Sequence, residues 1–277
     1  MTEMPADLHV HSTFSDGTDS PEEIVELASK IKLKTFALTD HDTVDGIDAA
    51  QKRGAELMVE VIPGIEFTCE VPRAEVHILG YFIDHKSPEL APVLTKIQTD
   101  RVARIYKIVE KLNKLGVGIS ADDVFAISGK KAPGRPHVAR ALIKKGFVSG
   151  FKEAFDRFLE FNGPAYVGHY KLTPAEAIKL IRQVNGVASY AHPAISNRDN
   201  LIPGMAAEGL RGIEAYYPGY ESQFTEHYVT LARKYGLLTT GGTDYHGKDS
   251  GREMTLGDIT VTDELVEKLR NEHLRGN

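Results

Sequence analysis

The sequence of 277 residues contains no tryptophan and only one cysteine, Cys69. A single cysteine cannot form an internal disulfide, so a disulfide scaffold is excluded and nothing argues for secretion. No apolar run approaches the roughly 18 residues of a membrane span, and the first residues show no basic stretch followed by an apolar one. We therefore expect a cytoplasmic protein without a membrane partner.

Hydrophobic residues make up 42% of the chain and charged residues 26%, which is the composition of a globular protein and excludes collagen-like or disordered chains. The net charge of −6 argues against binding to long duplex nucleic acid. This charge is unevenly distributed. Residues 86–165 hold 15 Lys and Arg against 8 Asp and Glu, a net of +7, and the rest holds 18 against 31, a net of −13. A basic middle in an acidic frame suggests two parts with different roles, although soluble lysine-rich helices would give the same pattern.

The frame alternates short apolar runs with amphipathic segments, and this order favours a parallel sheet or a β/α barrel. Helix starts are marked by two capping boxes, Ser20-Pro21-Glu22-Glu23 and Thr173-Pro174-Ala175-Glu176. The expected strands are Ala6–Val10, Thr35–Thr39, Val59–Ile65, Val76–Phe82, Val187–Ala191, Gly212–Tyr216 and Leu237–Gly241. Further helices are expected over Ala177–Val184, Tyr220–Tyr235 and Thr262–Leu274.

The middle of the chain has a helical pattern. Apolar residues recur at helical spacing from Leu90 to Leu115, and three shorter helices are expected to start at Ser120, Pro136 and Gly150. We therefore predict a barrel formed by residues 1–85 and 166–277, with a basic helical insert, residues 86–165, that covers the barrel mouth. The frame has only 197 residues without the insert, which is short for eight β/α units and favours a seven-stranded or distorted barrel.

Histidines and carboxylates follow the predicted strands. Alternation along the first strand places Asp7, His9 and His11 on one face, where two imidazoles can bind a metal and Asp7 can orient a ring. Other candidate ligands are Asp16, His41, Glu66, His77, His192, Asp244 and His246. Each alone is more often a turn or surface residue. Because so many polar groups at the functional end of a barrel are costly to bury without a ligand, the set predicts a multinuclear metal site.

The motifs Asp7-Leu8-His9-Val10-His11, Thr39-Asp40-His41-Asp42, Gly64-Ile65-Glu66, Ala191-His192-Pro193 and Thr243-Asp244-Tyr245-His246 resemble, in this order, those of the PHP (polymerase and histidinol phosphatase) superfamily. The middle segment, with Gly134-Arg135-Pro136-His137, resembles the insert of its TrpH-like branch. That branch includes phosphatases of 3′,5′-nucleoside bisphosphates and 5′→3′ exonucleases that act on short RNA. The resemblance implies a distorted (β/α)7 barrel with two to three divalent metals, most often Mn, with Fe or Zn as alternatives.

The resemblance also implies how the ligands are shared. One metal takes His9, His11, Glu66 and Asp244, and a second shares Glu66 and takes His77 and His192. A third takes Asp16, His41 and His246. Asp16 stands where many members have a histidine. Gly219-Tyr220 replace a histidine that often follows the motif Glu214-Ala215-Tyr216-Tyr217-Pro218.

Two metals bridged by Glu66 imply hydrolysis by an activated hydroxide, held by Glu66, His9, His11 and Asp244, that attacks phosphorus in line with the leaving alkoxide. No side-chain nucleophile is required, and Cys69 is interpreted as a packing residue. In the insert, Arg135 and His137 at a helix N-terminus are predicted to bind a second phosphate, with Arg198 as a weaker candidate. Lys130 and Lys131 are interpreted as solvated.

The sequence thus favours a metal-dependent phosphoesterase for small phosphorylated nucleotides, such as 3′,5′-nucleoside bisphosphates, or for short oligonucleotides. We expect it to be a monomer. One alternative is a histidinol-phosphate phosphatase, although a small monophosphate needs no basic insert. Another is a metal-stabilised binding module without turnover, although all nine ligand positions hold competent residues.

Overall fold

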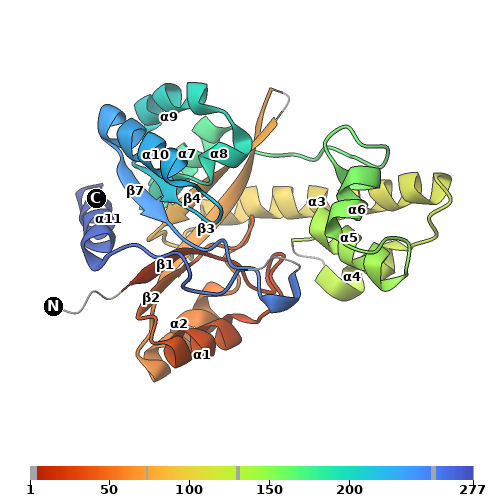
Figure 1. The fold of residues 1–277 in the computed structure, drawn as a ribbon, viewed down its shortest axis with the longest axis horizontal. Helices are drawn as coiled ribbons and strands as arrows, with labels where there is room; N and C mark the ends of the chain where they lie inside the picture. The colour runs from red at the N-terminus through yellow and green to blue at the C-terminus, as the bar shows by residue number, and fades with distance from the viewer. Residues whose placement is uncertain (1–4, 73, 129–131, 251–253, 277) are drawn as a thin grey trace.

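A computed structural model describes residues 5–72, 74–128, 132–250 and 254–276. Its described residues form one seven-stranded sheet in which the strands follow one another in chain order (Figure 1). The strands are β1 (Ala6–Val10), β2 (Thr35–Leu38), β3 (Glu60–Val71), β4 (Ala74–Tyr81), β5 (Val187–Tyr190), β6 (Gly212–Tyr216) and β7 (Leu238–Gly241). All seven predicted strands are present, and their first and last residues lie within a few residues of the prediction. The exception is the end of β3, which extends to Val71.

The expectation of repeated parallel strand–helix units is wrong at one place. β3 and β4 pair as an antiparallel hairpin, and β4 also runs antiparallel to β5, whereas the other neighbouring strands are parallel. The two strands of the hairpin are separated only by residues 72–73, which is too short for a crossover. As a result, the beginning of β4 lies at the same end of the sheet as the carboxyl ends of the parallel strands.

The sheet closes through the segment that follows β7. The amide of His11 donates to the carbonyl of Tyr245 over 2.8 Å, and the amide of Tyr245 donates to the carbonyl of His9 over 3.2 Å. Near the other end of β1, Ala6 and Val261 exchange two backbone hydrogen bonds. The sheet is therefore a distorted, nearly closed barrel, as predicted.

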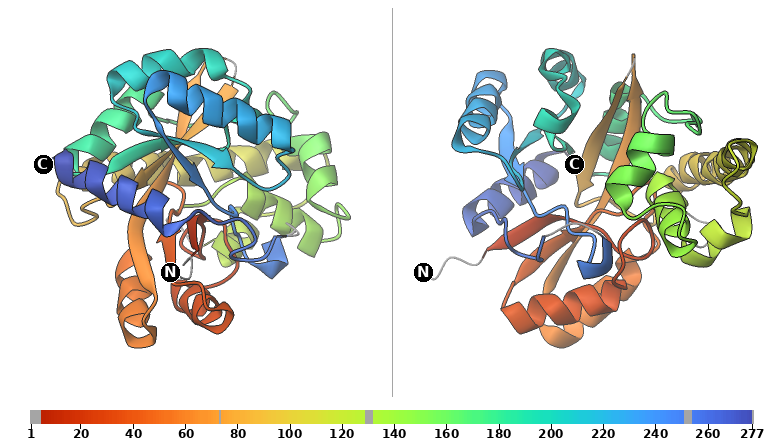
Figure 2. Two further views of the ribbon diagram at one scale, coloured as in Figure 1. Left: turned by 60° about the vertical axis from the view of Figure 1, so that its left-hand side comes forward. Right: turned by 45° about the vertical axis from the view of Figure 1, so that its right-hand side comes forward.

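Helices cover the outside of the barrel (Figures 1 and 2). They are α1 (Pro21–Ile31), α2 (Ile47–Leu57), α7 (Pro174–Gln183), α8 (Pro193–Ser196), α9 (Ile202–Glu208), α10 (Ser222–Tyr235) and α11 (Asp263–Arg275), with 3₁₀ turns over Asp199–Leu201 and Lys248–Ser250. Both predicted capping boxes are present, at Ser20 with Glu23 and at Thr173 with Glu176. Among the described residues, no helix combines the length and apolarity needed to cross a membrane.

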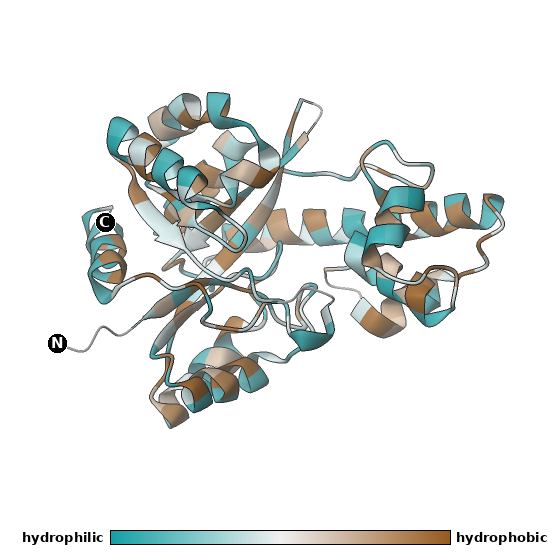
Figure 3. Ribbon diagram, in the orientation of Figure 1, coloured by the Kyte–Doolittle hydropathy of each residue, from teal (hydrophilic) through white to brown (hydrophobic). Residues whose placement is uncertain are grey.

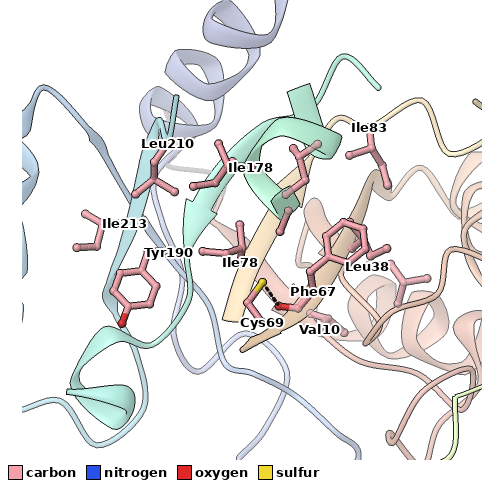
Figure 4. Close-up of a cluster of buried hydrophobic side chains, with 14 of the residues drawn as sticks. Val10, Leu38, Phe67, Cys69, Ile78, Ile83, Ile178, Tyr190, Leu210 and Ile213 are labelled. Carbon is pink, nitrogen blue, oxygen red and sulfur yellow. Dashed lines mark hydrogen bonds between the residues drawn. The ribbon is translucent and has the colours of Figure 1, made fainter. Parts of the chain in front are cut away.

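The apolar core between the sheet and its covering helices contains side chains that the apolar runs predicted (Figure 4). Phe67 and Ile78 from the hairpin pack with Leu38 of β2 and Tyr190 of β5. Cys69 is fully buried among them, and its thiol lies 3.7 Å from the carbonyl of Phe67. Burial raises the pKa of this thiol well above its usual value, so Cys69 is a packing residue and not a nucleophile.

Residues 90–128 and 132–159 form a helical module beside the barrel. It contains α3 (Leu90–Lys114), α4 (Ala121–Ser128), α5 (Arg135–Lys144), α6 (Phe151–Ala154) and a π-helical turn over Phe155–Leu159. The first half of α3 packs on the barrel through Leu94 and Ile97, whereas its second half joins a separate apolar core. Figure 3 shows the amphipathic character of these helices. The separate core supports the proposed insert, and α3 is continuous with both parts.

Candidate metal centre

The nine predicted ligand positions gather at one end of the barrel. They come from all strands but β6 or from the loops after them, and they are His9, His11, Asp16, His41, Glu66, His77, His192, Asp244 and His246. His77 was the residue that the strand-end argument placed least well. It reaches the cluster because it lies near the start of antiparallel β4, opposite Thr68 of β3.

Glu66 lies at the centre of the cluster. Its Oε2 is 3.3 Å from His9 Nε2, 3.2 Å from His11 Nε2 and 3.1 Å from His41 Nδ1. Its Oε1 is 2.9 Å from His77 Nδ1 and 3.1 Å from His192 Nε2. One carboxylate thus faces five imidazoles, which is the arrangement that a ligand shared between cations requires.

A second group of donors adjoins the first. His246 Nε2 is 3.1 Å from Asp16 Oδ1, and Asp244 Oδ1 is 3.2 Å from His11 Nε2. Donor atoms within 4.8 Å of one another form four sets, which overlap in His9, His11, His41 and Glu66. These sets are His11-Asp16-His41-His246, His9-His11-Asp244, His9-Glu66-His192 and His41-Glu66-His77. His41 adjoins both Glu66 and the Asp16 group, whereas the resemblance implied only the latter.

The polar atoms of this cluster fit divalent cations. The buried atoms without a hydrogen-bond partner among the described residues include His9 Nε2, His11 Nε2, Asp16 Oδ1, His41 Nδ1 and Glu66 Oε2. A buried polar atom without a partner costs about 1–3 kcal/mol, so a fold that collects several in one place needs a ligand there. Imidazole and carboxylate together suit Mn, Fe or Zn.

Charge coupling within the cluster favours carboxylates that stay ionised. Burial alone would raise the pKa of Glu66, but His41, His9 and His77 hold it well below its usual value. Burial alone would lower the pKa of His11, yet the neighbouring carboxylates of Asp244 and Glu66, each with an oxygen 3.2 Å from its Nε2, raise it to about 9. Cations and protons therefore compete for these rings.

Glu214 of β6 supports the cluster from behind, and sequence analysis did not assign it this role. Its Oε1 is 3.0 Å from His9 Nδ1, and its Oε2 accepts the backbone N–H of His192 over 2.7 Å. Asp7, which we expected to orient an imidazole, instead accepts the amides of Thr243 and Gly257. That expectation is wrong because the Asp7 carboxylate holds the β7 loop and not a ring. The signal for Glu214 was a carboxylate within an otherwise apolar strand.

Backbone strain occurs at the same end of the barrel. His192 and Asp244 have φ values of 26° and 49°, and Asp42, next to His41, has 52°. Non-glycine residues rarely adopt positive φ, and where they do the strain usually serves a site. Gly242 is required for close approach, because a Cβ there would lie 2.5 Å from the amide nitrogen of His9 and 2.7 Å from Asp7 Oδ1. The β7 turn is therefore shaped to bring Asp244 and His246 to the cluster.

A basic cavity of about 190 Å³ opens beside the metal cluster, between the barrel and the helical module. Asp16, His41 and His77 of the cluster line one part of it, and Arg101, Arg104, Arg135 and His169 line another. We call this the arginine cavity. Sequence analysis found only Arg135 here. The pair Arg101 and Arg104, three residues apart on α3, carried the missed signal of a basic helix face.

The guanidinium and imidazole groups of the arginine cavity differ in how they are bonded. Arg101 pairs with Asp42, and Arg135 lies 2.9 Å from Glu75. Arg104 Nη2 and both ring nitrogens of His169 are buried and have no hydrogen-bond partner among the described residues. Burial first, and then Arg135, lowers the pKa of Arg104 to about 10, so it still carries its charge at pH 7. Arg104 thus brings a buried positive charge to a cavity whose other two arginines are paired with carboxylates.

Two predicted substrate contacts are not placed at this site. His137 is 2% exposed, and its Nδ1 accepts the backbone N–H of Gly134 over 3.0 Å, so its ring caps α5 and lies outside the cavity lining. The guanidinium of Arg198 donates to the carbonyl of the adjacent Asn197 and also lies outside that lining. The His137 ring is used as a helix cap and the Arg198 side chain turns back on its own loop, so the two substrate contacts stay predictions. Lys130 and Lys131 lie outside the described residues.

The chain belongs to the PHP family, because residues 7–168 match the family model described as PHP domain. A solved structure from Bifidobacterium adolescentis, assigned as a metal-dependent phosphoesterase, superposes with a TM-score of 0.88 at 31% identity and covers 95% of this chain and 94% of that one. The predicted family and the predicted PHP-type barrel are both confirmed.

Three curated relatives match nearly the whole chain. A phosphoribosyl 1,2-cyclic phosphate 1,2-diphosphodiesterase of Eggerthella lenta is 31% identical over 88% of this chain and 95% of its own length. A 5′-3′ exoribonuclease of Haemophilus influenzae is 32% identical over 87% and 89%. A 3′,5′-nucleoside bisphosphate phosphatase of Chromobacterium violaceum is 29% identical over 88% of each. The expectation of a metal-dependent phosphoric ester hydrolase is confirmed, and neither alternative is favoured.

Proposed function

We propose that this enzyme hydrolyses a phosphate ester of a small nucleotide that carries a second phosphate, with a 3′,5′-nucleoside bisphosphate or the 5′ end of a short RNA as its substrate. The observation that carries the proposal is the arginine cavity directly beside the metal cluster. His77 and Asp16 belong to both, so a substrate can be held at the cluster and at the arginines together.

The residues that would hold cations are the nine donors of the cluster, with Glu66 shared between two positions. We propose two to three divalent ions per chain, with Mn as the metal. Such ions supply the activation of water at neutral pH and neutralise charge on the phosphate that reacts.

The chain's own residues provide orientation and selectivity. Glu214 lies against the Nδ1 atom of His9, so that the Nε2 atom of this ring faces the cluster, and the same carboxylate accepts the backbone N–H of His192. Arg104 and His169 offer N–H groups to an anion. Burial first, and then Arg101 and Arg104, hold the pKa of His169 far below its usual value, so its ring enters the complex neutral and can donate one N–H.

A substrate with a single phosphate, bound at the metal cluster, would leave the positive charge of Arg104 in the arginine cavity without a negative partner. A second phosphate satisfies the buried Arg104 Nη2 and a nitrogen of His169, and charge-assisted bonds of this kind are stronger than neutral ones. This preference argues against histidinol phosphate, which carries one phosphate and a cationic amine that Arg101, Arg104 and Arg135 would repel.

Phosphate release from a substrate panel tests the proposal. Protein loaded with Mn²⁺ is expected to release phosphate from 3′,5′-adenosine bisphosphate and to shorten a 5′-phosphorylated oligoribonucleotide, and a chelator is expected to abolish both activities. Turnover of histidinol phosphate alone would contradict the proposed substrate class. Full metal loading without turnover of any phosphoester would contradict catalysis itself.

A further inference from the structure

A second cavity, of about 220 Å³, adjoins the arginine cavity and has a different character. Phe151, Phe155 and Pro136 give it apolar walls, while Arg140, Asp16 and His246 stand at its edges. We call it the aromatic cavity. Phe155, Pro136 and Asp16 line both cavities, so the two are continuous across these residues.

The two phenylalanines are placed by the end of α6. Phe151 begins this helix and Phe155 begins the π-helical turn that continues it. Residues four apart in a helix lie on one face, so both rings face the same space. Each is only half-buried, although large aromatic side chains usually gain most from complete burial.

Two arginine side chains lie close to these rings. The guanidinium carbon of Arg140 lies 5.8 Å from the ring centre of Phe151, and that of Arg135 lies 5.7 Å from the ring centre of Phe155. Arg140 also donates from Nη2 to the carbonyl of Asp16 over 2.7 Å, which ties α5 to the loop of the metal cluster. The aromatic walls therefore stand at a fixed place relative to the candidate ligands.

We propose that the aromatic cavity binds the nucleobase of the substrate by stacking on Phe155 and Phe151; this inference rests on the proposed function. A nucleoside bisphosphate has three parts: a phosphate that reacts, a second phosphate and a planar base. The metal cluster, the arginine cavity and the aromatic cavity match these parts in chemistry, and Asp16 borders all three.

Stacking would select for the presence of a base without selecting one base over another, whereas hydrogen bonds would favour a particular base. Each of the four bases presents a π-face, so a stacking site accepts them all and rejects a sugar phosphate that has no base. The proposal therefore sets this enzyme with those relatives whose names specify nucleosides or RNA. It separates it from the relative that acts on a phosphoribosyl cyclic phosphate.

Paired substrates isolate the stacking contribution. We compare 3′,5′-adenosine bisphosphate with its abasic analogue, in which hydrogen replaces the adenine. Any effect of Phe155 that acts through Arg135 changes both substrates equally, since both carry the second phosphate. An effect through the base changes only the first.

Phe155→Leu is expected to lower kcat/KM about tenfold for adenosine bisphosphate and less than twofold for the abasic analogue, because base stacking on one aromatic ring is typically worth a factor of this order. Phe151→Leu is expected to act in the same direction, and Phe155→Tyr is expected to retain activity. Phe224→Leu on α10, a residue 41% exposed and outside both cavity linings, is the matched control and is expected to leave both substrates unchanged. Equal losses for both substrates, or no loss for either, would overturn the proposal.

The absence of tryptophan allows a binding test that does not depend on turnover. Phe155→Trp and Phe224→Trp each introduce the sole tryptophan of the chain. With Mn²⁺ bound, a hydrolysis-resistant phosphonate analogue of adenosine bisphosphate is expected to quench the fluorescence of Phe155→Trp in a saturable way, and not that of Phe224→Trp. The abasic phosphonate is expected to quench neither.

The two assays separate the two proposals. If the wild-type enzyme hydrolyses neither bisphosphate, the proposed function fails, and fluorescence still decides whether a base binds at Phe155. If it hydrolyses both with equal kcat/KM and Phe155→Trp shows no quenching, the base site is refuted while the proposed phosphatase activity stands.

Discussion

Glu66 and Glu214 are buried carboxylates that contact the imidazole of His9 from opposite sides. Glu66 faces the Nε2 atom of His9, and Glu214 lies against its Nδ1 atom. A metal-ligating histidine usually has its second ring nitrogen bonded in this way, and loss of such a partner typically weakens metal affinity 10- to 100-fold. Substitution of Glu66 and substitution of Glu214 are therefore expected to weaken metal binding to different extents.

Glu66→Gln is expected to abolish the binding of at least one Mn²⁺ per chain and to reduce turnover to near background, because it removes a charge shared by five imidazoles. Glu214→Gln is expected to weaken Mn²⁺ binding 10- to 100-fold while activity recovers at high Mn²⁺. Metal titration with elemental analysis measures both. Glu70→Gln, on the same strand as Glu66 but exposed, is the control. Normal metal content in Glu66→Gln would refute the shared ligand.

His137 predicts a dependence of stability on pH. Burial lowers the pKa of His137 to about 4, while the unfolded side chain titrates near 6.5. The folded state needs the neutral ring, since Nδ1 accepts the N–H of Gly134. The contribution of this ring is therefore complete above about pH 6.5 and is lost as the pH falls from 6.5 towards 4, by roughly 1.4 kcal/mol per pH unit.

Urea unfolding at pH 7, 6 and 5 measures this effect as the difference between the wild type and His137→Gln. Glutamine at this position can also cap the helix but does not titrate. The variant is expected to lose less stability than the wild type over this range. Parallel curves for the two proteins would show that His137 does not contribute.

At the scale of elements, sequence periodicity predicted most strands and helices to within a few residues. It failed for the β3–β4 hairpin, because an apolar strand reads the same in either direction and Glu70-Val71-Pro72 gave no turn type that fixed it. The helix expected to start at Gly150 is, in the structure, the short α6 followed by a π-helical turn that ends at Leu159. Because the antiparallel direction of β4 was not predicted, the sequence did not explain why His77 joins the cluster.

The site itself was predictable only in part, for a related physical reason. Ligands directly after strands could be found because parallel strands end at one edge. Arg104 and His169 could not, since a cavity between α3 and the segment after the π-helical turn depends on how the helical module packs. The role of His137 could not be fixed from the sequence, because a histidine near a helix start serves equally as a cap or as a ligand contact.

The arginines of α3 and α5 predict substrate-dependent kinetics. Arg104→Gln and Arg135→Ala are expected to raise KM for 3′,5′-adenosine bisphosphate about 10- to 100-fold, which is the loss of a charge-assisted contact of roughly 1.5–3 kcal/mol. They are expected to change KM for an aryl monophosphate less than threefold. Arg157→Gln, in the same module but outside both cavity linings, is the control. Equal effects on both substrates would contradict a second-phosphate site.

At the scale of the whole molecule, the metal cluster joins β1, β3, β4 and the segments after β2, β5 and β7. Any ligand that binds the folded state alone stabilises it, by about 4 kcal/mol when its concentration is 1,000 times its dissociation constant. Bound cations would therefore stabilise the barrel as a whole.

Chelation is expected to lower the thermal midpoint of the wild type by several degrees, and added Mn²⁺ is expected to restore it. Glu66→Gln is expected to show a much smaller shift, because its cluster binds metal poorly. Differential scanning calorimetry at fixed protein concentration measures the shift. An unchanged midpoint in the wild type, at saturating Mn²⁺ by elemental analysis, would contradict the link between metal and fold.

The helix α3 has 25 residues and belongs to both apolar cores. At 1.5 Å per residue it is about 37 Å long, and a continuous helix resists bending. Its first half packs on the barrel, and its second half packs with α4, α5 and α6 in the core of the helical module. The distance between the metal cluster and the two cavities therefore depends on this helix, together with the contacts of Arg101 with Asp42, Arg135 with Glu75 and Arg140 with the carbonyl of Asp16. Substitutions where α3 packs with α4, α5 and α6 would therefore change which substrate is bound and leave the metal cluster unchanged.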